Sequence, residues 1–417
     1  MTGLFPVRFF TACWKKKLTL DYVISQYSSL PFGKMDPLVR QLLRLAIYQI
    51  VYMDGVPESA AVNESVELAK KMGKGRAAGF INGVLRSFLR AGGEIRLPQP
   101  GKDRASWLSL AYSIPRPLIK LWQNQYPKED AEALLRGMTG HAPLFVRVNT
   151  RRIDAPGLCS RLAEEGVKAQ LFPDFSDCVV LYHAGALEHL EAFRQGLFHV
   201  QDLSGQVCAS ALGVRPGMRV LDCCAAPGGK SFTLAQRMED AGELIAGDLY
   251  PQKAALIQKG AERLGLFSIR AVTADASVFS PQMGLFDRVL CDVPCSGFGI
   301  IRRKPEIRYK DLDTLRDLPA VQYKILETAA QYVKPRSGIA FPMRRNNTVG
   351  AIAHSPSGDI RAKLQSPSPT GEGAAPSTKA AVEGIGGFPV CLFRSGICFP
   401  AKTYKILQVY YIAERRG

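Results

Sequence analysis

The stretch from Val220 to Ser231, VLDCCAAPGGKS, limits what this chain can fold into more than any other. Its apolar start is typical of a buried strand, and the glycine-containing loop after it leads into apolar residues at helical spacing. Glycines in such a loop let a ligand approach the backbone closely, and the start of the helix offers free amide donors. We therefore predict a strand–loop–helix unit that binds a nucleotide-like ligand.

The loop also resembles a phosphate-binding P-loop, whose pattern is G-x-x-x-x-G-K-[ST]. Gly229, Lys230 and Ser231 fit the pattern, but Cys224 stands where the first glycine is required. An ATPase is therefore the less favoured interpretation, and it predicts stabilisation of the protein by ATP rather than by another ligand.

From Gln201 onward the expected strands and helices alternate, which is typical of an α/β, doubly wound, Rossmann-like sheet. The expected strands are Arg219–Asp222, Leu244–Asp248, Ile269–Thr273 and Phe286–Asp292. An aspartate ends or closely follows each of them, namely Asp222, Asp248, Asp275 and Asp292. Ligands of such sheets bind beyond the carboxyl ends of the strands, where these groups would gather.

Asp248 lies about 20 residues after the glycine loop, the spacing at which a carboxylate accepts hydrogen bonds from ribose hydroxyls. A single aspartate at a strand end is as often a helix cap or a turn residue. Four of them around one glycine loop favour an adenosine-containing cofactor.

The part of the chain before this sheet divides into two regions. Residues 1–96 are expected to be helical, with Asp36-Pro37 as a helix start. Residues 102–200 read as a small α+β domain similar to an RNA-recognition motif. Its tryptophans, at helical spacing, are expected in the core rather than stacked on bases. Basic residues at Lys74, Arg76, Arg86 and Arg90 are equally compatible with a solvated helix face and with RNA contact.

The net charge and the spacing of the cysteines limit the kinds of partner and metal ion that we expect. The chain of 417 residues carries 54 Lys plus Arg against 37 Asp plus Glu, a net charge of +17 that favours a polyanionic partner such as RNA. Its 10 cysteines and five histidines lack the paired spacing of a zinc site, so we expect no metal. No apolar run is long enough to span a membrane and no targeting segment is evident, so we expect a cytoplasmic monomer.

A second motif, Asp292-Val293-Pro294-Cys295-Ser296-Gly297, decides between these ligand classes. Together with the glycine loop, it resembles the RNA cytosine-5 methyltransferases of the Nop/Sun superfamily. The segments 42–49, 56–64 and 77–86 resemble part of the NusB-like RNA-binding domain, although the opening helices of such domains are not evident. Both features together are similar to the small-subunit rRNA methyltransferases of the RsmB/Sun type, with altered ends.

This resemblance implies S-adenosyl-L-methionine as cofactor and small-subunit rRNA as partner. It places the cofactor against the loop residues Cys224, Ala225, Ala226, Pro227, Gly228, Gly229 and Lys230. Asp248 would hold the ribose, Asp275 would lie by the adenine, and Asp292 would sit between the cofactor and the target base. Cys295 is assigned by the resemblance to product release.

The attacking thiol of the family belongs to a Thr-Cys motif on a strand after a Val-Lys-Pro turn. Val333-Lys334-Pro335 is present, but no cysteine lies between Cys295 and Cys391. Residues 343–385 have the composition of a disordered segment, so we expect residues 336–417 to be a disordered or frame-altered tail.

Two functions therefore remain open. One is formation of 5-methylcytosine in small-subunit rRNA, with Cys295 as a substitute nucleophile, as in DNA cytosine methyltransferases. The other is an inactive RNA-binding or assembly protein that retains the cofactor pocket.

Overall fold

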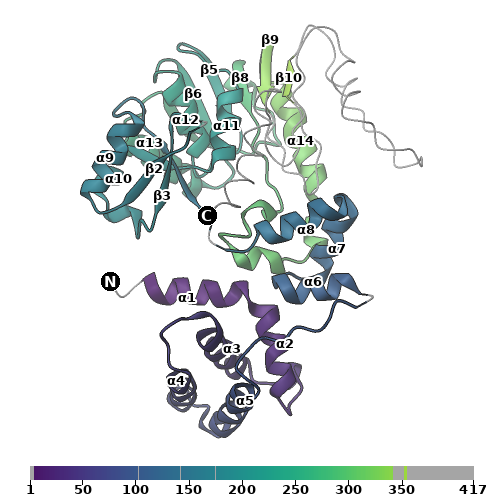
Figure 1. Cartoon of the computed structure of the whole chain (residues 1–417). Helices are drawn as coiled ribbons and strands as arrows, with labels where there is room; N and C mark the ends of the chain where they lie inside the picture. Colours follow the sequence, from purple (N-terminus) through teal and green to yellow (C-terminus); the bar gives the residue numbers. More distant parts are fainter. Residues whose placement is uncertain (1–3, 102, 141, 174, 341–351, 355–417) are drawn as a thin grey trace, which may run out of the picture. The chain divides into compact units, whose positions relative to one another are not determined.

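The computed structural model describes residues 4–340 and 352–354, apart from residues 102, 141 and 174. The chain forms two compact units (Figure 1). The first consists of Met1–Ala142 with Gly297–Thr314, and the second of Pro143–Ser296 with Leu315–Gly417. The chain therefore leaves the second unit just after the Pro-Cys-Ser motif and returns to it after 18 residues.

The first unit is helical, as the sequence predicts. Its helices are α1 Leu4–Lys15, α2 Lys17–Tyr27, α3 Pro37–Tyr52, α4 Glu58–Lys71, α5 Ala78–Arg90, α6 Arg104–Tyr112, α7 Arg116–Gln125 and α8 Lys128–Gly137. The carboxylate of Asp36 caps α3 as expected, because Asp36 Oδ1 accepts from Leu38 N at 2.8 Å. Helices α3, α4 and α5 pack together (Figure 1).

Helices α1 and α2 occupy a region in which the sequence reading placed none. Leu20, Val23 and Ile24 of α2 are buried, and Cys13 of α1 joins them in the same apolar core. Their spacing of three and four residues puts them on one helix face. The opening of the helical unit is thus built by residues 4–27, which differs from the expectation that such helices are lacking.

The segment Gly297–Thr314 packs into the helical unit through three short 3-10 helices, η5 Phe298–Ile300, η6 Pro305–Tyr309 and η7 Asp313–Leu315. Arg308 is buried and donates to the carbonyls of Lys15 (3.0 Å) and Ser113 (2.8 Å). Phe298 meets Trp122 edge to face, with ring centroids 6.3 Å apart. Trp122 is 1% exposed, in agreement with its expected place in the core.

The second unit begins with a small antiparallel sheet. Its elements are β1 Leu144–Val148, α9 Ala155–Glu164, β2 Lys168–Leu171, β3 Cys178–Tyr182, α10 Glu191–Arg194 and β4 Phe198–Val200, and the strand order is β2-β3-β1-β4. The succession β-α-β-β-α-β is that of a ferredoxin-like fold. The sequence predicted an α+β unit here but did not locate β2, whose residues are mostly exposed.

A six-stranded sheet forms the rest of the second unit. Its strands are β5 Arg219–Asp222, β6 Glu243–Asp248, β7 Ile269–Thr273, β8 Phe286–Leu290, β9 Val333–Ala340 and β10 Ile352–His354, in the order β10-β9-β8-β5-β6-β7. All neighbouring strands are parallel except β10, which is antiparallel to β9. The expected Rossmann-like sheet is confirmed, although β8 ends at Leu290, two residues earlier than predicted.

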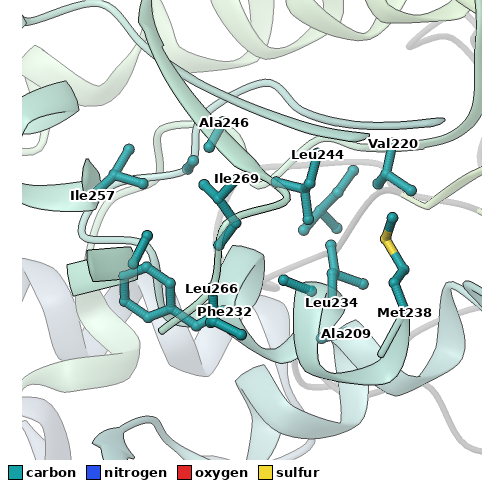
Figure 2. Close-up of a cluster of buried hydrophobic side chains, with 14 of the residues drawn as sticks. Ala209, Val220, Phe232, Leu234, Met238, Leu244, Ala246, Ile257, Leu266 and Ile269 are labelled. Carbon is teal, nitrogen blue, oxygen red and sulfur yellow. The ribbon is translucent and has the colours of Figure 1, made fainter. Parts of the chain in front are cut away.

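Helices cover both faces of this sheet. Alternate residues of β5 and β6 face α11 Leu203–Ala211, α12 Gly229–Arg237 and α13 Pro251–Leu264 in one apolar cluster (Figure 2). The intervening residues Leu221 and Ile245 pack with Ile325 and Ala329 of α14 Leu318–Ala330. This alternation buries both faces, as a parallel sheet requires.

Buried polar groups join the small sheet to the large one. Arg147 on β1 is 1% exposed; its Nε donates to Gln236 of α12 (3.1 Å) and it pairs with Asp177 (3.0 Å). Asn149 Nδ2 donates to the carbonyls of Gly196 (2.8 Å) and Leu264 (2.9 Å). We call these contacts the polar seam, and they hold the two sheets in a defined relation.

Two parts of the tract expected to be disordered are ordered as strands, because residues 336–340 belong to β9 and residues 352–354 form β10, which pairs with residues 338–340. The remainder of residues 341–417 lies outside the described part of the chain. Within the described part, no helix is long and apolar enough to cross a membrane. No group of three or more His, Cys, Asp or Glu side chains there is arranged to hold a metal ion.

Candidate active site

The glycine loop connects β5 to α12 as predicted and is fixed by its own backbone. Ala225 N donates to Gly247 O at the end of β6 (2.8 Å), and Gly228 N donates to Ala225 O (2.7 Å). Gly228 has φ of 106°, and a Cβ there would lie 2.3 Å from the ring of Phe232. Only glycine can occupy this position without strain, so the turn into α12 depends on it.

The first turn of α12 is held by two hydrogen bonds to the carbonyl of Gly229. His199 Nε2 on β4 donates to Gly229 O (3.2 Å), and Thr233 Oγ1 donates to the same carbonyl (3.0 Å). Burial, reinforced by the charge of Arg147, lowers the pKa of His199 to about 3. The imidazole is therefore neutral at physiological pH and acts as a fixed hydrogen-bond donor.

Lys230 and Asp292 bring the two sequence motifs together. Lys230 Nζ forms an ion pair with Asp292 Oδ2, which joins the start of α12 to the loop that carries the Pro-Cys-Ser motif. Both side chains are mostly shielded from solvent, with 16% and 31% exposure. Two residues that the sequence assigned to different parts of one site are thus in direct contact.

Asp222, at the end of β5, lies beside this pair. Ser231 Oγ donates to Asp222 Oδ2 (2.7 Å), and the carboxyl group is buried. Burial raises the pKa of Asp222 to about 7; the Ser231 hydrogen bond and the charge of Lys230 oppose the rise, and the charge of Asp292 adds to it. Asp222 and Asp292 are therefore close enough for their charges to interact.

Asp248 ends β6 with a carboxylate that is largely buried. The residue is 8% exposed; Oδ1 accepts from Tyr250 N (3.3 Å) and lies 3.6 Å from Lys253 Nζ. Asp275 differs, because its exposed carboxylate accepts from the backbone and hydroxyl of Ser277 (2.9 and 2.7 Å). These bonds lower the pKa of Asp275. They also form a local turn, which is the structural role that a strand-end aspartate has when it binds no ligand.

Cys295 is half-buried in the loop after β8. The loop is held by α14, because Gln322 Nε2 donates to Pro294 O (2.6 Å). Burial, followed by the nearby Cys223 and acidic groups, raises the pKa of Cys224 far above the usual value. Cys224 is therefore a neutral thiol.

Val333-Lys334-Pro335 forms the start of β9 rather than a turn before it, and β9 contains no cysteine. Among the described residues beyond Cys295, no further cysteine occurs. Cys391 and Cys398 lie outside the described residues. The thiol available at the described site is therefore that of Cys295.

The residues present suit an adenosyl sulfonium cofactor. Its ribose hydroxyls require an acceptor, and a shielded carboxylate such as that of Asp248 at the end of β6 is an acceptor of the right kind. Its sulfonium is a cation, and the carboxyl groups of Asp222 and Asp292 lie beside the glycine loop, where an acidic environment favours a cation. A triphosphate would instead meet these acidic groups, which agrees with the poor P-loop match.

Comparison with known proteins supports the same assignment. Residues 209–341 match the family described as 16S rRNA methyltransferase RsmB/F, residues 5–90 match the NusB family, and residues 114–188 match the ferredoxin-like domain of RsmF/B-like methyltransferases. The Bacillus subtilis protein named "Probable ribosomal RNA small subunit methyltransferase B" is 38% identical over 325 residues, which cover 77% of this chain and 71% of that protein. The chain belongs to the RsmB/F family. It is a family of S-adenosylmethionine-dependent rRNA methyltransferases.

Solved structures show the same fold. The crystal structure of PH0851 has a TM-score of 0.68 and 23% identity, and the match covers 80% of this chain and 75% of that one. NSun6 from Pyrococcus horikoshii, solved with SFG, has a TM-score of 0.51 and 18% identity, over 54% of this chain and 82% of that one. The RsmB/F assignment therefore agrees with the ferredoxin-like and Rossmann-like sheets.

Several side chains that support the site were not singled out from the sequence. They are His199, Thr233 and Gln322, which contact Gly229, Gln201 and Pro294 on other elements of the chain. A signal was present for Gln322, because it is a polar residue at a position where helix periodicity requires burial. Its partner could not be read from the sequence.

Proposed function

We propose that this RsmB/F protein binds S-adenosylmethionine at the glycine loop and methylates carbon 5 of a cytosine in small-subunit rRNA, acting as a cytoplasmic monomer. The observation that carries the proposal is the Lys230–Asp292 contact, because it puts the loop and the Pro-Cys-Ser motif in one site. In this proposal Cys224–Lys230 and Asp248 contact the cofactor, and Asp275 lies at its adenine end.

The chemistry assigns different tasks to the chain's own groups. Cytosine carbon 5 becomes nucleophilic only after a thiolate adds to carbon 6, and Cys295 is the half-buried thiol beside Asp292 in sequence and in the loop. S-adenosylmethionine supplies the methyl group when bound. Asp292, held by Lys230, accepts a hydrogen bond from the base and orients it. The target base must be unstacked or single-stranded to enter.

A second candidate function is binding of cofactor and rRNA without methyl transfer. It is favoured by one observation, which is that no cysteine lies between Cys295 and Cys391. In the family pattern the attacking thiol follows the Val-Lys-Pro turn, and here that position belongs to β9, which has none. Cys295 would then lack the second thiol that completes the reaction cycle.

Trapping with RNA that contains 5-fluorocytosine separates the two functions, because fluorine at carbon 5 blocks the release that normally needs loss of a proton. Wild type and the Cys159→Ser control, which changes a half-buried thiol on α9, are expected to form a covalent adduct. Cys295→Ser is expected to lose it. An adduct that survives in Cys295→Ser would assign the attack to another cysteine. Cofactor binding with neither adduct nor methylated product would favour the binding-only function.

A further inference from the structure

The side chain of His199, on β4 of the small sheet, contacts the residue that begins α12, at the end of the glycine loop. We propose that His199 is a positioning residue for S-adenosylmethionine, which acts on the cofactor by fixing the conformation of this loop. The inference rests on the proposed cofactor site at the glycine loop. It adds a residue of the ferredoxin-like sheet that sets the affinity of that site.

His199 and Arg147 lie opposite each other where β4 pairs with β1. Both side chains are buried, and residues opposite each other in neighbouring strands share one face of the sheet. His199 Nε2 donates to Gly229 O at 3.2 Å. Arg147 Nε donates to Gln236 Oε1 at 3.1 Å. Gly229 and Gln236 are seven residues apart, which is about two helical turns, so this face of the small sheet holds α12 near both of its ends.

The imidazole ring of His199 also supports the loop through Phe232. The two rings meet edge to face, with their centroids 5.5 Å apart. A Cβ added at Gly228 would lie 2.3 Å from Phe232 Cζ, so the phenyl ring lies against the backbone of the loop. His199 therefore supports two consecutive glycines, Gly229 by a hydrogen bond and Gly228 by way of the phenyl ring.

Thr233 does not replace His199 as the donor to the Gly229 carbonyl. Thr233 Oγ1 lies 3.0 Å from Gly229 O but 2.6 Å from Gln201 Oε1. A hydroxyl group has a single hydrogen, so Thr233 shares it between these two acceptors, and the contact with Gln201 is the shorter. The N–H of His199 is therefore the side-chain donor on which the Gly229 carbonyl mainly depends.

The contact with Gly229 defines the tautomer of His199. A carbonyl oxygen only accepts, so Nε2 carries the hydrogen and Nδ1 carries the lone pair. Burial, followed by the charges of Arg147 and Arg263, lowers the pKa of His199 to about 3, although its contacts with Gly229 and Gln201 oppose this change. The imidazole is thus neutral at physiological pH, and its donor is present whatever the pH in that range.

The carbonyl that His199 holds belongs to the turn that shapes the cofactor loop. Gly228 N donates to Ala225 O (2.7 Å) and Gly229 begins α12, so the loop and the helix are continuous at this point. Groups that bind a ligand must be held within about 0.5 Å of the binding geometry by the contacts that support them. Without the His199 donor, part of the binding free energy would be used to order the loop.

The test is the dissociation constant of S-adenosylmethionine, measured by isothermal titration on the full chain. His199→Phe keeps an aromatic ring against Phe232 but removes the N–H, and it should weaken binding about tenfold. His199→Gln places an amide N–H near the position of Nε2 and should restore most of the affinity.

Asn149→Ala is the matched control. Asn149 is a buried donor directly after β1, and its partners, the carbonyls of Gly196 and Leu264, lie outside the glycine loop. Its removal should lower the thermal stability of the protein and leave the dissociation constant close to that of wild type. Thermal unfolding of all four proteins shows how much stability each variant has lost.

Equal affinity in wild type and His199→Phe would overturn the role of His199 and leave the proposed cofactor site standing. An equal loss in His199→Gln and His199→Phe would show that the N–H is not what matters. An equal loss in Asn149→Ala would show a general effect of stability, and either result would also overturn the role. Absence of S-adenosylmethionine binding by wild type would overturn the proposed function together with the inference.

Nitrogen-15 NMR of the imidazole of wild type needs no variant, so it tests the proposal even if His199→Phe does not fold. The spectrum should show the Nε2–H tautomer, unchanged from about pH 5 to 8. An Nδ1–H tautomer, or a titration of His199 within that range, would contradict the hydrogen bond to Gly229 and overturn the proposal.

Discussion

The ammonium group of Lys230 and the carboxylate of Asp292 form an ion pair that bridges two loops separated by 62 residues of sequence. The pair links the start of α12 to the loop after β8. Asp222 lies near both, and its pKa responds to each of their charges. The charge of Lys230 in the glycine loop and that of Asp292 beside the Pro-Cys-Ser motif therefore interact, so that removing one charge changes the electrostatic environment of the other.

Replacing one partner of this pair should destabilise the protein. Lys230→Met is expected to lower the free energy of unfolding by about 1–3 kcal/mol, because a shielded carboxylate loses its charged partner. Lys230→Met/Asp292→Asn should cost less than the sum of the single variants. Urea unfolding of the four proteins in a double-mutant cycle gives the coupling free energy, and additive losses would contradict the pairing.

The two expected ribose and adenine aspartates should differ in their effect on cofactor affinity. Asp248→Asn removes a charged acceptor from a shielded strand end and should weaken S-adenosylmethionine binding about tenfold or more. Asp275→Asn should have a smaller effect, because the carboxylate of Asp275 already accepts hydrogen bonds from the backbone N–H and the hydroxyl of Ser277. Isothermal titration measures both, and a larger loss for Asp275→Asn would reverse the assignment of the two residues.

The raised pKa of Asp222 makes stability depend on pH with a defined sign. Between the unfolded value near 3.9 and the folded value of about 7, the folded protein keeps a proton that the unfolded chain releases. Stability should therefore fall as pH rises through this window. Asp222→Asn removes the effect, so its stability relative to wild type should increase from pH 4 to 7 by about 1.4 kcal/mol per unit of pKa difference.

Unfolding by urea at a series of pH values checks the Asp222 prediction. Asp275→Asn is the control, because the pKa of Asp275 is lowered by the hydrogen bonds of Ser277 and gives no gain in that window. A flat difference between Asp222→Asn and wild type across pH 4–7 would show that Asp222 is not buried as described.

Two glycine substitutions should change stability in opposite directions. Gly228→Ala places a Cβ 2.3 Å from the Phe232 ring at φ of 106° and should destabilise by about 1–3 kcal/mol. Gly83→Ala, in α5 with open space around it, should stabilise by about 1 kcal/mol through helix propensity. Thermal unfolding measures both, and a Gly228→Ala protein as stable as wild type would contradict the geometry of the turn.

Much of the second unit could be predicted because its signals are local. The strands at Arg219–Asp222 and Ile269–Thr273 are apolar runs bounded by turns, and the aspartates follow directly from the parallel topology. Strand β2 was missed because its residues are mostly exposed and lack the alternation that marks a buried face. Helix α2 has Leu20, Val23 and Ile24 at helical spacing, but its start carries no capping signal in the sequence, because Lys16 at the N-cap makes no side-chain hydrogen bond.

Only part of the site could be predicted, because some of its contacts depend on tertiary packing rather than on local sequence. Loop residues such as Gly228 are read from the sequence because the strand–turn–helix unit alone positions them. The contacts of Gln322 with Pro294 and of His199 with Gly229 join residues 28 and 30 positions apart, and tertiary packing determines them. The sequence shows residue types at such positions but not which partners they meet.

The polar seam between the two sheets restricts how this protein could be recombined with relatives. Arg147 on β1 donates to Gln236 on α12, and Asn149, just after β1, donates to the carbonyl of Leu264 at the end of α13. A chimera with a foreign ferredoxin-like domain would leave Gln236 and the Leu264 carbonyl without their hydrogen-bond donors. It would also remove the His199 side chain that donates to the carbonyl of Gly229 in the glycine loop. The small sheet and α12 would therefore have to be exchanged together in such a chimera.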